Sequence, residues 1–524
     1  MAHRELRPTI PRMLKVLSSR AVRNLDARAA HLGVAPLLLM ESAGHGAAWA
    51  IRLWNPDLAD KRVLAVCGKG ENGGDALSAA RWLGLWGADP RAVILGDPEG
   101  PAADQASAFQ ASFPENVLRV ESEADAAALE TWLAESDLVL DGILGVGSSG
   151  PAQGVAGMAI EAVNAARRPV VALDLPSGLA ADTGTIPGPA VRAELTLAMG
   201  CFKPCHLLPP AAEFCGEVRP VDVAYPPDLW SEAETLAEVL EASDVRALLP
   251  ARPRYGHKGT FGKVLVVGGS VGMVGAAALA AEGALRAGAG LVHVLTPEPL
   301  FPIVAGLVPE ALVHPGPAAG GMLSPKAAEE AVRLAEDVDA AVVGPGLGRG
   351  PGPMEVVRSL LRSGVRLVLD ADALVALAQE PDLLRGDHRE VILTPHPGEF
   401  SRLVGTDPDA IVPDKIRWAK DTARKWKSVV VLKGPPTAIA DAEGRVSLSA
   451  TGNTALSHGG SGDILAGVIG GLWAGGASPR DAACGGVFVH GRAADLLAAR
   501  CSPRGVLPTD LFAALGEALA EIEG

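Results

Sequence analysis

Short apolar runs recur along the chain at intervals that leave room for a helix between them. In the first half these runs cover residues 63–67, 93–95, 138–140 and 170–173. They are continuously apolar, which is typical of central strands in a parallel sheet covered on both faces. Stretches rich in Ala and Leu between them, such as 75–85 and 157–166, predict helices. The alternation predicts an α/β fold in which helices cover a parallel sheet.

The alternation pauses around residues 225–228 and an acidic stretch at 231–241 follows, which predicts a helix. It then restarts, with strand candidates at residues 263–267, 291–295, 340–343, 366–369, 391–393 and 429–432. The pause predicts a domain boundary near residues 230–240. We therefore expect two α/β domains, at residues 1–232 and 238–524, each long enough to fold alone.

Composition limits the partners. Hydrophobic residues make up 48% of the 524 residues and charged residues 20%, which is typical of a folded protein with large buried cores. The net charge of −15 argues against a nucleic-acid or anionic-membrane partner. The least polar run, 464–479, is shorter than the roughly 20 residues of a membrane span and predicts a buried helix and turn. The six cysteines predict reduced thiols in a cytoplasmic protein rather than a disulfide scaffold.

Polar, Gly-rich loops follow three strands of the first half. They begin at Gly68, Asp141 and Asp174. Because ligands bind outside the carboxyl ends of strands in open α/β sheets, the three loops predict one pocket. The oxygens of Asn72, Asp141 and Ser177 suit a hard cation such as K⁺, Na⁺ or Mg²⁺. The alternative is that each Asp or Asn caps a helix or turn, and three loops in register disfavour it.

Chemistry-bearing loops also follow strands of the second half. They are Gly344–Gly348, Asp370–Leu374, Thr394–Glu399 and Lys433–Thr437. The stretch Gly459-Gly460-Ser461-Gly462-Asp463 precedes an apolar helix, where backbone N–H groups at a glycine turn favour a phosphate. Asp463 would then lie within reach of the phosphate as a general base, unless it is only an N-cap.

Two further residues of these loops have open roles. His396 lies between two prolines, so its backbone is held extended, and it either contacts a polar substrate group or is a turn histidine. Lys433 either binds phosphate as a point charge or is solvated.

The first half resembles the NAD(P)H-hydrate epimerase family over about residues 10–230. The resemblance is carried by Asn72-Gly73-Gly74-Asp75, Asp141-x₃-Gly145-x-Gly147, Asp174-x-Pro176-Ser177-Gly178 and Phe202-Lys203-Pro204. It implies a Rossmann-like three-layer domain that inverts the hydroxyl-bearing C6 of hydrated NAD(P)H. It also implies K⁺ at Asn72, Asp141 and Ser177. Implied substrate contacts are Glu71, Asn72, Gly73, Gly74, Asp75, Gly145, Val146, Gly147, Ser148, Ser149, Gly150, Pro151 and Asp174. Asp174 and Lys203 are the candidates for proton transfer, and Glu71 departs from a second Asn in many relatives.

The second half resembles the ribokinase-like superfamily over about residues 240–520, and within it the ADP-dependent NAD(P)H-hydrate dehydratase family. His257-Lys258-Gly259, Gly344–Gly348, Thr394–Glu399 and Gly459–Asp463 carry the resemblance. It implies that Ala276, Gly346, His396 and Asp463 face the hydrated dinucleotide. It implies that ADP, with Mg²⁺, is bound by Lys433, Gly434, Pro435, Pro436, Thr437 and Gly462. His458 departs from the usual pattern inside this motif.

Together the two resemblances imply a bifunctional repair enzyme. Its first domain would epimerise the R and S forms of hydrated NADH and NADPH, and its second would dehydrate the S form with ADP. Asp463 would take the proton of the hydroxyl as it is phosphorylated, and the ring nitrogen would then expel the phosphate. One alternative is a small-molecule alcohol kinase with a regulatory first domain, and another is a first domain that only binds. We expect no nucleic-acid or membrane partner, and a homo-oligomer.

Overall fold

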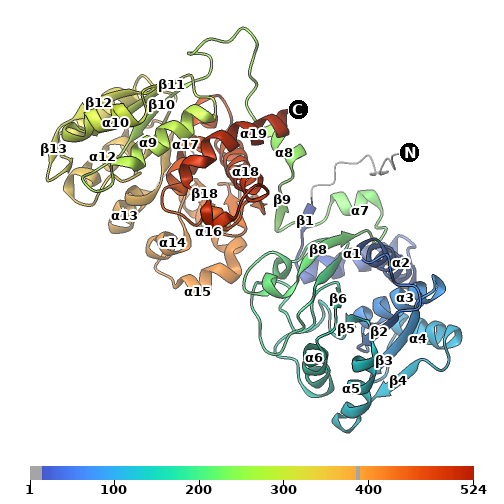
Figure 1. Ribbon diagram of the computed structural model, residues 1–524. Coiled ribbons are helices and arrows are strands. Elements are labelled where there is room, and N and C mark those ends of the chain that lie inside the picture. The colour runs from blue at the N-terminus through green and yellow to red at the C-terminus, as the bar shows by residue number, and fades with distance from the viewer. Residues whose placement is uncertain (1–13, 385–389) are drawn as a thin grey trace. The chain divides into compact units, whose positions relative to one another are not determined.

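A computed structural model describes residues 14–384 and 390–524. The chain divides into two compact units, Leu14–Leu236 and Ala237–Gly524 (Figure 1). Residues 1–13 of the expected first domain lie outside the described residues. Each unit has its own sheet, so the two are described separately.

The first unit is built on a seven-stranded, fully parallel sheet with the order β4-β3-β2-β5-β6-β7-β8. Its strands are β2 (Arg62–Cys67), β3 (Asp89–Leu95), β4 (Val117–Val120), β5 (Leu138–Gly142), β6 (Val170–Leu173), β7 (Leu195–Met199) and β8 (Glu217–Val221). Its helices are α1 (Ser19–His31), α2 (Pro36–Trp54), α3 (Glu71–Leu85), α4 (Pro101–Ser112), α5 (Ala126–Glu135), α6 (Gly154–Ala166) and α7 (Pro227–Ser231), and β1 is Leu14–Val16.

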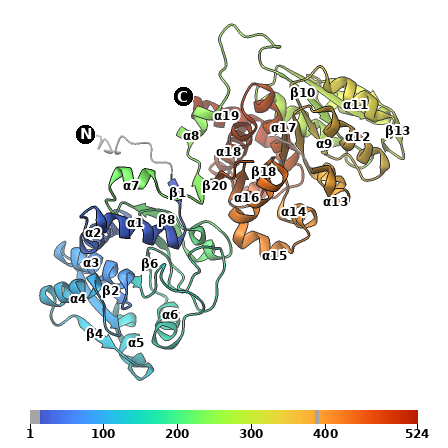
Figure 2. The ribbon, with the colours of Figure 1, turned by 180° about the vertical axis from the view of Figure 1, so that it is seen from behind.

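Strand β2 shows why the apolar runs are continuous. Val63, Ala65 and Cys67 pack into a core formed with α1, α2 and α3. Leu64 and Val66 pack into the opposite core, with α5 and α6. The helices therefore lie on both faces of the sheet (Figures 1 and 2). The expected three-layer α/β architecture is confirmed for this unit.

The second unit holds a larger mixed sheet with the order β9-β20-β19-β18-β17-β16-β15-β10-β11-β12. Its strands are β9 (Ala237–Val239), β10 (Lys263–Val267), β11 (Leu291–Pro297), β12 (Leu312–Gly316), β15 (Ala340–Val343), β16 (Leu367–Leu369), β17 (Val391–Leu393), β18 (Val429–Leu432), β19 (Thr437–Ala440) and β20 (Val446–Ser449), with a separate hairpin of β13 (Ala318–Ala319) and β14 (Met322–Leu323). The pairs β18–β19 and β19–β20 are antiparallel.

Helices cover both faces of this sheet as well (Figures 1 and 2). They are α8 (Ala242–Leu248), α9 (Val274–Arg286), α10 (Phe301–Leu307), α11 (Ala327–Ala335), α12 (Pro351–Ser363), α13 (Ala371–Gln379), α14 (Pro397–Val404), α15 (Pro408–Ile411), α16 (Lys415–Trp426), α17 (Ser461–Ala474), α18 (Pro479–Ala498) and α19 (Leu511–Glu523). Helices α9, α17, α18 and α19 share one large apolar core with the sheet. The run at 464–479 is thus the buried helix and turn that its composition predicts, and no described helix is long and apolar enough to cross a membrane.

One predicted element is wrong. The acidic stretch 231–241 is not a helix, because α7 ends at Ser231 and Ala237–Val239 forms the strand β9. Ala237 and Val239 are buried, and Val239 pairs with Leu448 of β20. Pairing at the end of a sheet therefore overrides the helix preference of the acidic residues.

Both sheets contain a point where the strand order reverses. In the first unit the chain runs from β2 outward to β4 and returns to place β5 on the other side of β2. In the second unit it runs from β10 to β12 and returns to place β15 beside β10. Loops diverge at such a switch point and leave a crevice at the carboxyl ends of the strands. The fold therefore offers one ligand position in each unit.

Candidate functional site

A cavity of about 690 Å³ opens at the switch point of the first unit. Most residues expected to contact substrate line it: Glu71, Asn72, Gly73, Asp75, Gly145, Val146, Gly147, Ser148 and Asp174, together with Lys203. Gly74, Ser149, Gly150 and Pro151 are not among the lining residues. At Gly74 the cause is packing, because a Cβ there would lie 2.4 Å from the sulfur of Met40 on α2.

A buried ion pair joins Lys203 to Asp174 in this cavity. The Lys203 ammonium donates to Asp174 Oδ1 and to the carbonyl of Met199, which lies 3.0 Å away. Burial alone would lower the pKa of Lys203, but the carboxylate of Asp174 raises it overall. Asp174 also has a φ of 61°, a strained conformation for a residue other than glycine. The surrounding contacts therefore hold this carboxylate in a fixed position.

Further carboxyl groups face the same cavity. Burial raises the pKa of Asp75 well above its usual range, and it raises the pKa of Glu71 and of Asp26 as well. The Tyr225 hydroxyl donates to Asp26 over 2.5 Å. Sequence reasoning missed Asp26 and Tyr225, because they come from distant parts of the chain and no local motif marks them. The cavity thus combines the buried ammonium of Lys203 with several carboxyl groups that disfavour one another's charge.

The three residues expected to hold K⁺ lie together at this cavity, with Asn72 in its lining. Asp141 is fully buried and accepts hydrogen bonds from the hydroxyl and the backbone N–H of Ser177, at 2.6 and 2.8 Å. The side-chain oxygen of Asn72 is buried and has no hydrogen-bond partner. Among the described residues no cation forms an ion pair with Asp141, whose pKa burial raises to about 6. A buried carboxylate and an orphaned amide oxygen fit a bound monovalent cation.

The cysteine-rich segment near this site holds free thiols. Cys201, Cys205 and Cys215 are buried and unpaired as disulfides. The Nδ1 of His206 accepts from the backbone N–H of Lys203, and its Nε2 lies 2.7 Å from the carbonyl oxygen of Asp174. Within residues 14–384 and 390–524, no group of three His, Cys, Asp or Glu side chains is placed to hold a metal. His206 therefore supports the Asp174 backbone.

In the second unit, Lys433 lies at the centre of a carboxylate cluster. Its ammonium is 2.9 Å from Asp370 Oδ1 and 4.0 Å from Glu399 Oε2. The Thr394 hydroxyl also donates to Asp370, over 2.8 Å. Burial alone would lower the pKa of Lys433, but Asp370 and Glu399 raise it overall. The sequence placed Asp370 and Glu399 in strand-end motifs but assigned neither a role.

Asp463 belongs to the same cluster and stands in the first turn of α17. The N-cap of that helix is Gly460, with a φ of 105° that favours glycine, so Asp463 is not the N-cap. Burial, together with the neighbouring carboxylate of Asp370, raises the pKa of Asp463 to about 7, and Lys433 opposes the rise. A Cβ at Gly462 would lie 3.4 Å from the Lys433 nitrogen. The carboxylate of Asp463 therefore titrates near neutral pH. It stands beside the point where the backbone of Gly462 approaches the ammonium of Lys433.

Tight packing of α17 against α9 sets the position of Asp463. A Cβ at Gly467 would lie 2.0 Å from the carbonyl oxygen of Ala280, and one at Gly283 would lie 2.6 Å from that of Ile464. Only glycines allow this approach without displacing backbone. The small residues of both helices therefore act together to place the first turn of α17.

The loops after β10 and β15 meet at the switch point of this unit. A Cβ at Gly346 would lie 2.9 Å from the Cβ of Ala276, so these two expected substrate contacts are neighbours. The backbone N–H of Gly348 donates to Asp372 over 2.9 Å, which ties the β15 loop to α13. These contacts place the glycine loop beside the start of α9.

The two histidines of the motifs have different surroundings. His396 is exposed and caps α14, because its Nδ1 accepts from the N–H of Gly398 over 3.0 Å. His458 Nδ1 lies 3.1 Å from the carbonyl oxygen of Ala455, one turn before the glycine motif. His396 therefore shapes the turn, as the turn-histidine interpretation expects. Its Nε2 lies 3.5 Å from Glu399 Oε1.

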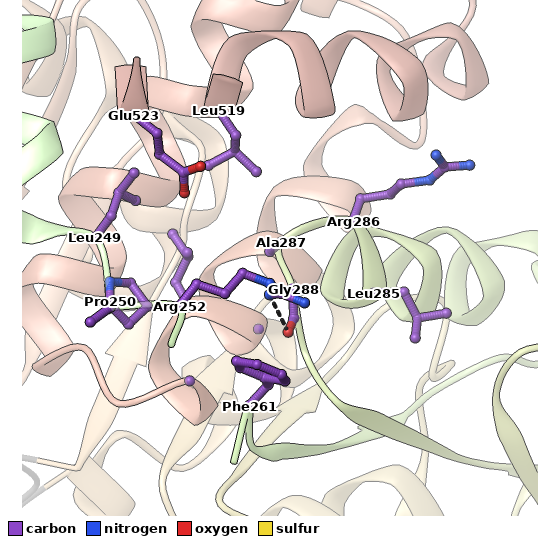
Figure 3. A pocket seen from close by; sticks show the side chains of 14 residues that line it. Leu249, Pro250, Arg252, Phe261, Leu285, Arg286, Ala287, Gly288, Leu519 and Glu523 are labelled. Carbon is purple, nitrogen blue, oxygen red and sulfur yellow. Dashed lines mark hydrogen bonds between the residues drawn. The ribbon is translucent and has the colours of Figure 1, made fainter. Parts of the chain in front are cut away.

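A second cavity, of about 270 Å³, lies elsewhere in this unit (Figure 3). It is bordered by the ends of α9, α17 and α19 and by the segment 249–252. Arg252 lies over the ring of Phe261, with 4.3 Å between guanidinium carbon and ring centroid, and donates to the carbonyl of Gly288. None of the predicted site residues lines it.

The fold and these clusters define an α/β enzyme with two separate strand-end sites, the second in a ribokinase-like unit. The profile of a family described as NAD(P)H-hydrate dehydratase matches residues 264–516. That of the YjeF-related protein N-terminus matches residues 37–205. Known proteins are similar to this chain over nearly its whole length and identify its family more narrowly. The chain belongs to the family of bifunctional NAD(P)H-hydrate repair enzymes.

Two of those relatives are named bifunctional NAD(P)H-hydrate repair enzyme Nnr. The protein of Moorella thermoacetica is 38% identical, with 93% of each chain covered. The protein of Coxiella burnetii is 36% identical, with 95% of this chain and 98% of that one covered. A crystal structure of an ADP/ATP-dependent NAD(P)H-hydrate dehydratase from Bacillus subtilis, co-crystallised with ATP and Mg²⁺, is 33% identical and covers 54% of this chain and 98% of that one, with a TM-score of 0.48. The family and the enzyme class expected from the sequence are confirmed.

Proposed function

We propose that the two sites divide the repair of hydrated NADH and NADPH between them. The first, in residues 1–232, interconverts the R and S forms, and the second, in residues 238–524, dehydrates the S form with ADP. The observation that carries the proposal is the similarity to bifunctional repair enzymes over 93% of the chain, with polar clusters at both switch points. We further propose, from the sequence alone, a cytoplasmic homo-oligomer.

In the first site, Asp174 and Lys203 are proposed to move the proton that accompanies inversion at C6. The Lys203 ammonium keeps its charge through neutral pH because its pKa is raised, so it holds Asp174 in place while the carboxylate exchanges a proton with substrate. Glu71–Asp75 and Gly145–Pro151 would bind the substrate. Gly145 supports this, because a Cβ there would lie 3.0 Å from the Cβ of Asn72 and would narrow the cavity.

Asn72, Asp141 and Ser177 would hold K⁺ beside this pocket, where a cation supplies positive charge for an anionic part of the substrate. The buried Asp141 and the unpartnered oxygen of Asn72 support this assignment. Glu71, which stands where many relatives have Asn, adds a carboxyl group to the cavity lining. Burial raises the pKa of Glu71, which favours the protonated carboxyl, and a protonated carboxyl can donate a hydrogen bond as an amide does.

In the second site, Asp463 is proposed as the general base. It would take the proton of the ring hydroxyl while that oxygen attacks the terminal phosphoryl group of ADP, giving AMP and a phosphate ester. The lone pair of the ring nitrogen then expels inorganic phosphate and leaves an iminium ion, and loss of the proton on the neighbouring ring carbon restores the nicotinamide double bond. Ala276, Gly346 and His396 would face the dinucleotide. Mg²⁺, bound with the ADP, would supply charge neutralisation on the phosphates.

The ADP site is proposed at the loop Lys433–Thr437 and at Gly462. Lys433 lies beside Gly462 at the start of α17, where backbone N–H groups and the helix dipole favour a phosphate. Its ion pair with Asp370 would be exchanged in part for phosphate oxygens. The kinase alternative shares this arrangement, so only the reaction products separate the two.

The test uses hydrated NADPH prepared as a mixture of both forms. Purified protein with ADP and Mg²⁺ should restore the reduced-nicotinamide absorbance completely, with AMP and phosphate formed in equal amounts. Asp463→Asn should stop recovery and still interconvert R and S by chromatography. Lys203→Met should restore only the fraction present as S. Phosphorylation of simple alcohols without recovery of NADPH would refute the proposal in favour of a kinase.

A further inference from the structure

Lys415 is a buried lysine that the proposed mechanism does not use. It is the first residue of α16 and only 1% exposed. Its ammonium donates to the carbonyl of Pro436 over 2.8 Å and to the carbonyl of Lys433 over 3.3 Å. Both acceptors belong to the loop Lys433–Thr437. Lys415 therefore lies directly beneath the proposed ADP loop and fastens it at two points.

The same ammonium also restricts the space for a side chain at Gly434, in the middle of that loop. Gly434 has a φ of 112°, which favours glycine, and a Cβ there would lie 3.1 Å from the Lys415 nitrogen. The loop is tied on its other side by the N–H of Lys433, which donates to the carbonyl of Pro395 over 2.9 Å. The backbone that would contact phosphates is thus held between Lys415 and the β17 loop.

Lys415 is also a charge without a neutralising partner. In the part of the chain that the structure describes, no carboxylate forms an ion pair with it. The strands packed against α16, β18, β19 and β20, carry no titratable side chain, and Asp414 in the preceding turn pairs with Arg417. Lys433, in the loop itself, is already bound by Asp370 and Glu399.

We propose that Lys415 is a positioning residue for the nucleotide loop and that its proton is coupled to ADP binding. This inference rests on the proposed ADP site. An anion bound on the loop stabilises the charged form of an ammonium buried beneath it, so the protein with ADP takes up a proton at Lys415. The charged form, with its hydrogen bonds to two carbonyls, also holds the loop in its binding conformation.

The sign of the effect follows from linkage. Burial lowers the pKa of Lys415 from 10.5 to about 7 in the absence of nucleotide. Above neutral pH the free protein therefore loses this proton, and ADP has to bind while a proton is restored. The dissociation constant for ADP should rise about tenfold between pH 7 and pH 8.5 from this group alone. Below pH 7 the group is protonated in both states and contributes little slope.

The experiment compares wild type with three variants of the full chain by titration calorimetry with ADP and Mg²⁺ at pH 7.0 and 8.5, in buffers of different ionisation enthalpy. Asp463 and the phosphates of ADP titrate equally in all four proteins, so the comparison isolates Lys415. In Lys415→Arg the charge is permanent. The tenfold rise of the ADP dissociation constant between pH 7 and pH 8.5 and the accompanying proton uptake should therefore disappear, while the affinity for ADP at pH 7 should be kept. In Lys415→Met the pH dependence and the proton uptake should also disappear, but ADP should bind about tenfold more weakly at pH 7 because the hydrogen bonds to the loop are lost. Lys425→Met, an exposed lysine of the same helix, should behave as wild type.

Folding and proposed function are controlled in the same samples. Epimerisation by the first unit reports whether each variant chain is intact, and Lys415→Met serves alone if Lys415→Arg does not fold. A merely structural role would change the melting temperature of Lys415→Met but leave its pH slope equal to that of wild type. Equal slopes and equal proton uptake would overturn the inference alone. Failure of wild type to bind ADP would overturn the proposed ADP site and the inference with it.

Discussion

Replacing Asp463 by Asn tests the proposed base with little change of shape. The side chain stands in the first turn of α17, near Asp370 and Lys433, and its pKa is raised to about 7. Asn cannot accept a proton, so the dehydration rate should fall by about 10²–10⁴-fold, which corresponds to roughly 3–5 kcal/mol of transition-state stabilisation. In wild type, the rate should rise with pH between 6 and 8, because the ionised carboxylate is the active form. The variant should lose this dependence.

The same substitution should stabilise the second unit. Asp463 holds its proton more tightly in the folded state than in the unfolded state, where its pKa is 3.8. The free energy of unfolding of wild type therefore falls as pH rises from about 4 to about 7. The rise in pKa sets an upper bound of about 4 kcal/mol on the loss, and partial exposure to water reduces it to about 2 kcal/mol. Removing the charge should recover that amount above pH 7.

Two assays check these values. Recovery of reduced nicotinamide absorbance at saturating ADP gives the rate, with epimerisation as the control in the same chain. Thermal unfolding at pH 8 should show Asp463→Asn melting about 5 °C above wild type, with a gap that closes as the pH falls towards 4. Dehydration within threefold of wild type would refute the role of Asp463 as base. A melting temperature below wild type at pH 8 would refute the electrostatic reasoning.

Three further predictions concern both units. Lys203→Met leaves the carboxylate of Asp174 buried without its partner, so epimerisation should stop and urea unfolding should show a loss of about 3–5 kcal/mol; an active, fully stable variant would contradict the ion-pair argument. Gly467→Ala places a Cβ 2.0 Å from the carbonyl of Ala280, so it should cost about 1–3 kcal/mol by thermal melting and slow dehydration more than epimerisation; unchanged melting would show that α9 and α17 can separate freely. Replacing K⁺ by choline should slow epimerisation of wild type, but should have no further effect on Asp141→Asn; equal sensitivity of both would exclude the proposed cation site.

The sequence predicted most of the architecture because buried parallel strands leave a strong signal. The runs at 63–67 and 264–267 are continuously apolar, and both become parts of central strands flanked by a switch point. The helix prediction for 231–241 was wrong because its acidic residues favour a helix locally, whereas Val239 pairs with Leu448 of β20, a residue far away in the sequence. The local pattern of apolar and polar residues indicates which side of a helix or strand is buried. It does not indicate which distant strand will complete a sheet.

Site residues were predictable to the extent that they follow strands. Asp141, Asp174 and Asp463 adjoin glycine-rich stretches at the ends of strands or at the start of a helix, where the pattern itself indicates chemistry. Asp26 lies on a helix among ordinary surface-type residues, and its contact with Tyr225 spans nearly the length of the first unit. Lys415 likewise looks like a solvated helix lysine until the fold buries it. Residues that act from beneath a loop carry no local signal, because their role depends on tertiary contacts alone.

The two proposed catalytic carboxylates differ in how lysine is used around them. Lys203 contacts Asp174 directly, and its raised pKa keeps the ammonium charged through neutral pH. Lys433 is bound instead by Asp370 and Glu399, which neutralise most of its charge. The pKa of Asp463 therefore stays near 7. When phosphates draw Lys433 away from Asp370, the negative charge left on Asp370 favours a proton on Asp463. In the proposed mechanism, nucleotide binding would therefore help Asp463 to hold the proton that it takes from the substrate hydroxyl.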